Sequence, residues 1–203
     1  INEYVCSHVT LDGVYLDQTA AMKGRTWIGF VKHGGNNVDF SYTVKNCNFR
    51  NAASSLDEKN IAPGSEGMWQ FNIFQNAPEP MKTQIPSTYK SEVSFTNNIF
   101  YNPIKGTQDK GNNYVIYLHN TGYFTKFTFD DNRIINVNNS LRPDSSILYF
   151  STVNSADNCM LDGNVSINNN KLIGWTENFA NKTDFGWGSA NPQITNVDTH
   201  NYD

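Results

Sequence analysis

The segment Val93-Ser-Phe-Thr-Asn-Asn-Ile-Phe-Tyr-Asn102 decides the fold, because its pattern recurs along the chain. Residues 42–51, 127–136 and 165–174 align with it without gaps. The first and third columns of this alignment are always apolar, and the second always carries a hydroxyl. This two-residue period is typical of a strand with one buried face. A polar step rich in Asn and Asp follows, and a second apolar column comes after it.

A weaker fifth copy precedes these four, since residues 9–17 fit the pattern if their turn is one residue shorter. Another strand recurs between the copies, at residues 27–33, 69–75, 114–119 and 147–151. The turn markers are 34, 51, 34 and 38 residues apart if they are Gly13, Cys47, Asn98, Asn132 and Asn170. Each unit is therefore expected to form one coil of three short strands, with the variation in length confined to two loops.

The sequence predicts an all-β fold, a right-handed parallel β-helix of about four to five coils. We expect the whole chain, residues 1–203, to form this single domain. A β-sandwich is the main alternative, but its strands do not repeat as columns. Helical folds are disfavoured because Gly, Asn and Pro interrupt every long helical period.

Thirty of the 203 residues are asparagine, and stacked coils would give many of them a role. Asn98, Asn132 and Asn170 share one column, with Cys47 in the first row. Amides at equal positions on adjacent coils can bond to each other and to the turn backbone. We expect such a ladder, and isolated turn caps are the alternative. A second ladder would contain Asn51, Asn102 and Asn136, with Gly174 in the last row.

Composition excludes some classes of protein. The net charge of -4 argues against a nucleic-acid partner, because phosphate binding needs clustered Lys and Arg. No apolar run approaches the roughly 18 residues of a membrane span. The chain begins at Ile1 without Met or a signal peptide, so we expect a processed or excised product. The spacing of Cys6, Cys47 and Cys159 is not of a metal-binding type, and buried free thiols are favoured over a disulfide.

The repeated blocks follow the pattern S/T-apolar-x-N-N-x-apolar-x-N and cover residues 9 to 175. They resemble the pectate-lyase-like superfamily of right-handed parallel β-helices, and most closely secreted Bacteroidetes β-helix proteins of unassigned function. The resemblance implies a secreted or cell-surface protein. The superfamily contains polysaccharide lyases and hydrolases, and also noncatalytic adhesins and spike proteins, and fold alone does not choose among them.

Stacked coils also align exposed side chains in rows. With Val31, Phe74, Leu118 and Phe150 inward, the outward row consists of Phe30, Ile73, Tyr117 and Tyr149, beside Lys32, Gln75, His119 and Ser151. An aromatic row beside polar and basic groups can hold a sugar chain. The candidate substrate-binding residues are Tyr117, Tyr149, Gln75, Arg133 and Lys171, the last two sharing a column with Asn48 and Ile99. The alternative is that the residues assigned as outward point inward, or that long loops cover the row.

A lyase needs a base that removes the proton alpha to a carboxylate, and a cation that stabilises the resulting negative charge. Lys32 and His119 are the catalytic candidates, and His119 has an ordinary pKa near neutrality. A solvated histidine without a role is the alternative. A Ca2+ ion is the one candidate cofactor. The alternative is that the aspartates that could bind it only stabilise turns. The candidate ligands of the ion are Asp12, Asp17, Asp130 and Asp131.

The expected function is that of a secreted module that binds or processes polysaccharide, as a lyase acting on acidic glycans if it is an enzyme. The chain lacks the cluster of Asp residues with an Arg on one strand that such lyases carry, which leaves catalysis open. The alternative is a noncatalytic structural or adhesive module of a cell-surface protein. Because the sequence shows no convincing cap at Ile1, we expect additional coils or another domain in the full-length protein.

Overall fold

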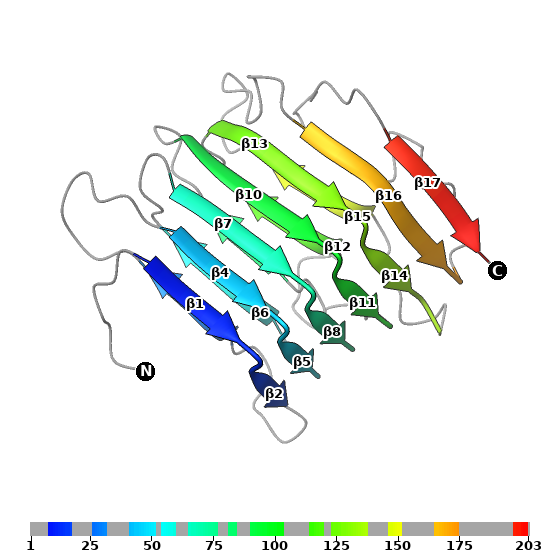
Figure 1. Cartoon of the computed structure of the whole chain (residues 1–203), viewed down its shortest axis with the longest axis horizontal. Helices are drawn as coiled ribbons and strands as arrows, with labels where there is room; N and C mark the ends of the chain where they lie inside the picture. The colour runs from blue at the N-terminus through cyan, green and yellow to red at the C-terminus, as the bar shows by residue number, and fades with distance from the viewer. Residues whose placement is uncertain are drawn as a thin grey trace.

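In a computed structural model, every described element of the chain is a β-strand, and all strand pairings are parallel. The structure describes residues 8–17, 26–31, 41–51, 54–59, 65–76, 81–84, 90–103, 114–119, 123–137, 146–151, 165–174 and 197–202. The strands stack along one axis in chain order (Figure 1). The predicted all-β parallel solenoid is therefore confirmed.

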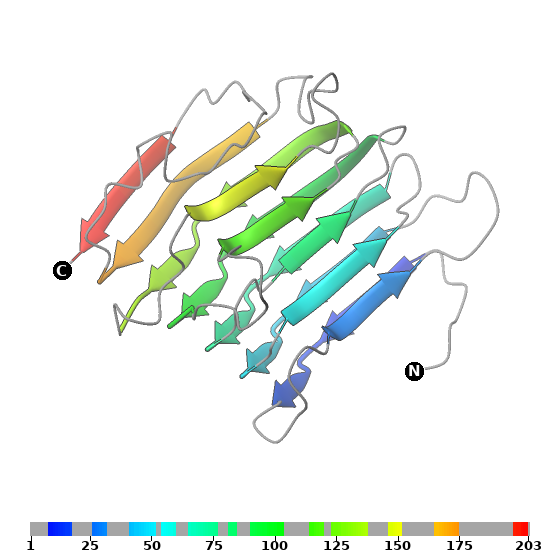
Figure 2. The ribbon, with the colours of Figure 1, turned by 180° about the vertical axis from the view of Figure 1, so that it is seen from behind.

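The strands belong to three stacked sets. The long strands are β1 (His8–Asp12), β4 (Ser41–Lys45), β7 (Ser65–Gln70), β10 (Lys90–Thr96) and β13 (Tyr123–Asp130). The short strands are β2 (Tyr15–Asp17), β5 (Asn48–Arg50), β8 (Ile73–Gln75), β11 (Ile99–Tyr101) and β14 (Arg133–Ile135). The third set, seen from behind in Figure 2, is β3 (Thr26–Val31), β6 (Ser54–Lys59), β9 (Met81–Gln84), β12 (Tyr114–His119) and β15 (Ser146–Ser151).

One strand joins the long and short sets. β16 (Val165–Ile173) is a single strand that spans the corner between the long and short sets, and it pairs with both β13 and β14. β17 (Val197–Tyr202) pairs with β16. The long and short strands consequently belong to one 12-stranded sheet, whereas the third set forms a separate 5-stranded sheet.

Within the repeated region, between residues 47 and 98, the stack contains a coil that the sequence pattern did not identify. Residues 69–75 were expected to belong to the strand between the repeats, but they contain the end of β7 and all of β8. β7 pairs with β4 and β10, and β8 pairs with β5 and β11. Asn72 is therefore the turn residue of a further repeat, halfway through the apparent gap of 51 residues between Cys47 and Asn98.

The first copy of the repeat was also misaligned at its turn. His8 pairs with Ser41 and Tyr15 pairs with Asn48, so the offset of 33 residues is the same before and after the corner. The turn is not one residue shorter, as the sequence suggested. Its equivalent of Cys47 is Val14, and Gly13 lies one position earlier.

The interior is a stack of aromatic side chains. Phe49, Phe74 and Phe100 lie in successive coils, with ring centroids 5.1 Å apart in each pair and planes within 13° and 6° of parallel. In the neighbouring column, Trp69 stacks on Phe95 at 6.1 Å. All five side chains are buried, with exposed fractions of 2% or less. Coil-to-coil contact of this kind buries apolar surface and gains dispersion energy along the whole axis.

A glycine makes room for the largest pair of rings. Gly67 occupies the inward column that holds Tyr42 and Val93 in the adjacent coils. A Cβ atom on Gly67 would overlap the Tyr42 ring, whose hydroxyl accepts a hydrogen bond from the Trp69 indole at 3.4 Å. The missing side chain therefore lets two bulky neighbours share one layer.

The predicted asparagine ladder is confirmed and extends one coil further, through Asn72. The side-chain Oδ1 atom of Asn98 accepts hydrogen bonds from both the backbone N–H and the side-chain amide of Asn72, at 3.0 Å each. The Asn98 amide in turn donates to the Trp69 carbonyl at 3.0 Å and to Asn132 Oδ1 at 3.1 Å. Asn132 and Asn170 repeat the arrangement, and all four side chains are fully buried.

The second predicted ladder is confirmed in part: it begins one coil earlier than expected, at Asp17, and it ends one coil earlier. Asn51 donates to Asp17, Asn76 donates to Asn51, and Asn102 donates to Asn76, with distances of 2.8 to 3.2 Å. Asn76 belongs to the coil that the sequence pattern missed. The Oδ1 atom of Asn102 is buried and has no partner among the described residues, so the described ladder ends there before reaching Asn136.

One residue of the hydroxyl column is buried, although the two-residue period of the repeat predicts that this column faces outward. Thr128 lies at an outward-facing position of β13, between the inward residues Phe127 and Phe129, yet its side chain is only 9% exposed. It is therefore no neutral surface position, and Ser94, its half-buried equivalent in β10, is the better outward reference.

Replacing Phe95 by Ala should lower the free energy of unfolding by about 3 to 5 kcal/mol, because the ring is fully buried between adjacent coils. Ser94→Ala, one residue earlier and facing outward, should change it by less than about 1 kcal/mol. Chemical denaturation of both variants measures the difference. Equal losses would contradict the inward column assigned to Phe95.

Removing the Asn98 side chain should cost more than about 3 kcal/mol, since Asn98→Ala leaves the buried Asn72 N–H and Trp69 carbonyl without their partners. The matched control is Asn97→Gly. Asn97 is exposed and has a φ of 58°, so glycine fits there and should cost under about 1 kcal/mol. The same denaturation experiment tests both, and a tolerated Asn98→Ala would refute the role of the ladder.

Candidate functional site

The outward side chains of the short strands form one continuous surface, here named the short-strand face. In each short strand the middle residue points into the core, as Phe74 and Phe100 do, so the residues on either side point outward. Strand pairing aligns these residues in two rows. The rows are Tyr15, Asn48, Ile73, Ile99, Arg133 and Lys171, and Asp17, Arg50, Gln75, Tyr101, Ile135 and Ile173.

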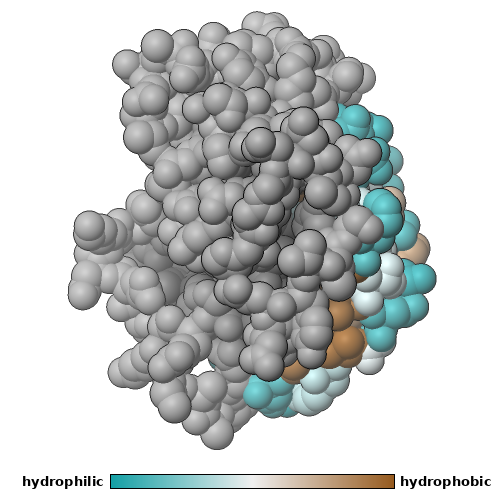
Figure 3. Space-filling view, turned by 90° about the vertical axis from the view of Figure 1, so that its left-hand side faces the viewer, coloured by the Kyte–Doolittle hydropathy of each residue, from teal (hydrophilic) through white to brown (hydrophobic). Residues whose placement is uncertain are grey.

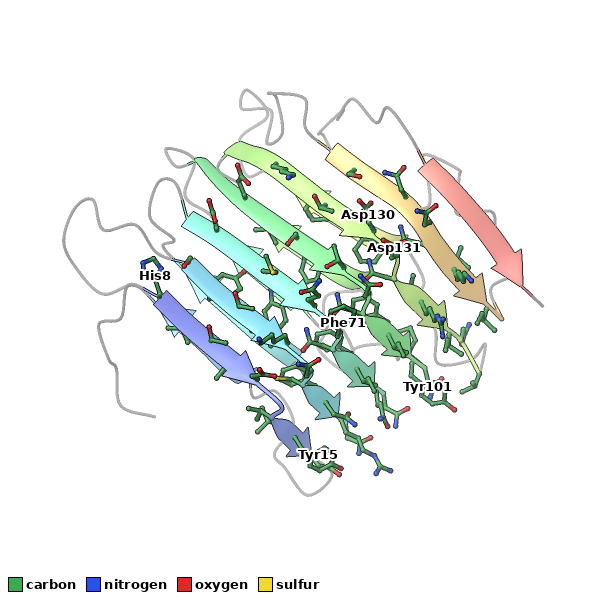
Figure 4. All side chains as sticks on the ribbon, viewed as in Figure 1. His8, Tyr15, Phe71, Tyr101, Asp130 and Asp131 are labelled. Carbon is green, nitrogen blue, oxygen red and sulfur yellow. The ribbon has the colours of Figure 1, made fainter. Side chains whose placement is uncertain are left out.

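This face carries exposed apolar surface. Tyr15 is 58% exposed and Tyr101 is 40% exposed, and both project from the short strands (Figure 4). Ile73 and Ile99 lie next to each other in register and are half-buried. The described residues at the end of the solenoid where β1 and β2 lie also mix hydrophobic and hydrophilic surface (Figure 3). Aromatic and aliphatic groups between polar ones suit a ligand with both kinds of surface.

The same face is basic although the whole chain is acidic. Arg50, Arg133 and Lys171 are exposed on it, and Asp17 is its one acidic residue. Arg133 and Lys171 are paired in register on adjacent strands, about 4.8 Å apart along the axis. The outward residues of the long strands have the opposite balance. They include Asp12, Glu66, Glu92 and Asp130 against Lys45 and Lys126.

The structure brings three of the five predicted substrate-binding residues together. Gln75, Arg133 and Lys171 all lie on the short-strand face, and Gln75 donates to Asn48 on the adjacent strand at 3.3 Å. Arg133 and Lys171 share the expected column with Asn48 and Ile99. Arg133 and Lys171 were predictable from the sequence because the repeat blocks themselves determine their register.

The other predicted residues belong to the third sheet. Tyr117 pairs with Tyr149, and His119 pairs with Ser151, as the sequence predicted. On its other side Tyr117 pairs with Lys82 of β9, a residue that the sequence analysis did not consider. β9 has the sequence Met-Lys-Thr-Gln, which lacks the alternation that would have identified it as a strand. Lys32 lies outside the described residues.

The row expected to link these residues was wrong in two places. Ile73, Phe74 and Gln75 lie in a short strand, in a different sheet from Tyr117. Through β6 and β9, Val31 aligns with His119 and not with Leu118, so this strand is one residue out of the expected register.

The four candidate calcium ligands do not converge on one site. Asp12 is on β1 and Asp130 is on β13, four strand spacings apart. Hydrogen bonds from the Asn46 amide and Lys45 hold the pKa of the Asp12 carboxyl below its usual value. The Asp130 carboxylate accepts bonds from the Ser166 hydroxyl and a backbone N–H at 2.7 Å each. Among the described residues, no group of three His, Cys, Asp or Glu side chains could hold a metal ion.

Cys47 is a buried part of the corner. Its backbone N–H donates to Asn72 Oδ1 at 3.0 Å, in the position that an asparagine fills in later coils. Its thiol lies 3.1 Å from the Lys45 carbonyl and 3.8 Å from the Leu11 carbonyl. Burial raises the pKa of the Cys47 thiol, and the thiol is free. Cys6 and Cys159 lie outside the described residues.

Comparisons with known proteins assign no family. No model of a known protein family matches the chain, and comparisons with curated proteins and with solved structures give no significant match. The resemblance to the pectate-lyase-like superfamily therefore rests on the repeated sequence blocks alone. In the described part of the chain, no helix is long and apolar enough to cross a membrane.

We expect Cys47 to resist alkylation by iodoacetamide in the folded protein, because the thiolate is the reactive form and burial raises the thiol pKa. Peptide mapping by mass spectrometry follows Cys47 separately from the other two cysteines. The control is the same reaction in denaturant, where Cys47 should be modified fully. Native modification at the rate of free cysteine would contradict the buried position.

Proposed function

We propose that the short-strand face binds an extended acidic polysaccharide. The observation that carries this proposal is the presence of three cationic side chains and two exposed tyrosines on one face of a chain with a net charge of -4. Guanidinium groups form bidentate hydrogen bonds with carboxylates, and tyrosine rings stack on the apolar faces of sugars. Both features suit a glycan that carries acidic groups.

The dimensions of the face favour a polymer over a small molecule. Six strands, from β2 to β16, contribute to it, so it extends over roughly 24 Å along the solenoid axis at the usual strand spacing. Ligand contacts would repeat from strand to strand, and an extended chain could meet several of them at once. Such multiple weak contacts give useful affinity without a deep pocket.

A lyase activity on acidic glycans is the enzymatic form of the proposal, in line with the resemblance to the pectate-lyase-like superfamily, and it would use a second contact region on the third sheet, where β12 carries His119. His119 would act as the base and Lys32 would neutralise the developing charge. The register neighbours of His119 are Gln84 and Ser151, which are polar. The noncatalytic alternative, an adhesive module of a secreted or surface protein, requires binding without cleavage.

Incubating the protein with pectins, alginate and glycosaminoglycans separates these forms. Binding with an increase in the ultraviolet absorbance of unsaturated products would identify a lyase, and His119→Ala should then abolish the increase while leaving binding intact. Binding without products would identify the adhesive form. No binding to any of these acidic glycans would refute the proposal in both forms.

Arg133→Ala should weaken binding of the preferred acidic glycan about fivefold, since an exposed ion pair contributes roughly 1 kcal/mol. Lys126→Ala is the matched control, because it removes one exposed cation from the long strands instead. Calorimetric titration at low and high salt measures both, and the effect of Arg133→Ala should shrink as salt screens the charge. Equal effects of the two substitutions would place the binding surface elsewhere.

A further inference from the structure

The corner between long and short strands places one residue of each coil from β1 to β16 in the left-handed backbone region. The residues at this position are Gly13, Asn46, Phe71, Asn97, Asp131 and Asn169, with φ values from 53° to 69°. Glycine, asparagine and aspartate tolerate this conformation, whereas a bulky side chain is disfavoured in it. Phe71 is the exception among the described coils.

Folding does not account for this phenylalanine. The Phe71 backbone N–H donates to the Thr96 carbonyl, as the equivalent N–H of Asn46 donates to the Gln70 carbonyl, so the turn is the same in both coils. The Phe71 ring is 52% exposed, and it projects from the turn between β7 and β8 (Figure 4). An asparagine would make the same turn with less strain, so the ring has a use outside the core.

The surroundings of the ring indicate what that use is. Met68, which precedes Phe71 on the same coil, is 44% exposed, and Ile73, which follows it, is half-buried on the short-strand face. Asn46 and Asn97 hold the equivalent turn positions on either side, about one strand spacing away. An aromatic ring between two amides offers stacking to the carbon face of a pyranose and hydrogen bonds to its hydroxyls.

We infer that Phe71 is a stacking platform for one sugar ring of the glycan bound at the short-strand face. This inference rests on the proposed function, and it assigns to Phe71 the apolar contact with the glycan that the charged residues do not make. The turn positions on both sides of Phe71 are asparagines, so the apolar turn surface does not continue from coil to coil as a large protein interface would require. A single pyranose ring fits such an area.

The test is Phe71→Asn, which installs the residue that adjacent coils use at this position. Affinity for the preferred acidic glycan should fall about tenfold, which corresponds to about 1.4 kcal/mol. The melting temperature should stay the same or rise, because the strained side chain is gone. Phe71→Tyr keeps the ring and should bind within about twofold of the unmodified protein.

Salt distinguishes this contact from the charged ones. Because stacking is not an ion pair, the loss caused by Phe71→Asn should persist at high salt, whereas the loss caused by Arg133→Ala should shrink. If Phe71→Asn binds as well as the unmodified protein, while Arg133→Ala still weakens binding, the inference fails and the proposed function stands. If the unmodified protein binds no acidic glycan, both fail.

Two other results would also overturn the inference. A clear fall in melting temperature with unchanged affinity would assign the Phe71 ring to folding. Binding of the unmodified protein to phosphatidylcholine vesicles that is lost in Phe71→Asn would assign the ring to a lipid surface instead of a sugar.

Discussion

The buried asparagine column at the corner is the interaction on which the rest of the structure depends. A sharp turn in each coil directs backbone N–H and carbonyl groups toward the interior, where an unpaired polar group costs more than a hydrogen bond returns. A ladder asparagine has two side-chain N–H donors and an oxygen that can accept two hydrogen bonds. Asn98, for example, satisfies the Asn72 N–H below it and the Trp69 carbonyl, and its amide reaches Asn132 above. The corner can therefore repeat without burying an unpaired group.

A fixed corner also determines the faces of the solenoid. Once the turn residues stack, every residue at a given distance from the turn stacks too, inward or outward. Phe49, Phe74 and Phe100 consequently form one continuous column, and the outward rows of the short strands become regular. The cationic residues Arg133 and Lys171 are neighbours for the same reason, although 38 residues separate them in sequence. The proposed binding face is thus a consequence of the ladder.

The sequence predicted the columns where ordinary residue preferences hold and failed where they are broken. The coil containing Asn72 escaped detection because it departs from the pattern at Gly67, Met68 and Phe71. Gly67 replaces an apolar inward residue to admit Tyr42, and Phe71 replaces the usual turn residue. In the third sheet, β6 and β9 carry no alternation of apolar and polar residues, so nothing in the sequence determined the register between Val31 and His119. Gln75 was placed in the wrong sheet as a result, whereas the repeat blocks placed Arg133 and Lys171 correctly.

Nuclear magnetic resonance can observe the ladder directly, through scalar couplings that pass across hydrogen bonds. The account predicts a coupling from the backbone nitrogen of Asn72 to the side-chain carbonyl carbon of Asn98. It predicts a second coupling from the backbone nitrogen of Asn98 to the side-chain carbonyl carbon of Asn132. These couplings should appear in the unmodified protein and the first should vanish in Asn98→Ala. Couplings from the same nitrogens to backbone carbonyl carbons, with none to asparagine side chains, would contradict the ladder and the stacking derived from it.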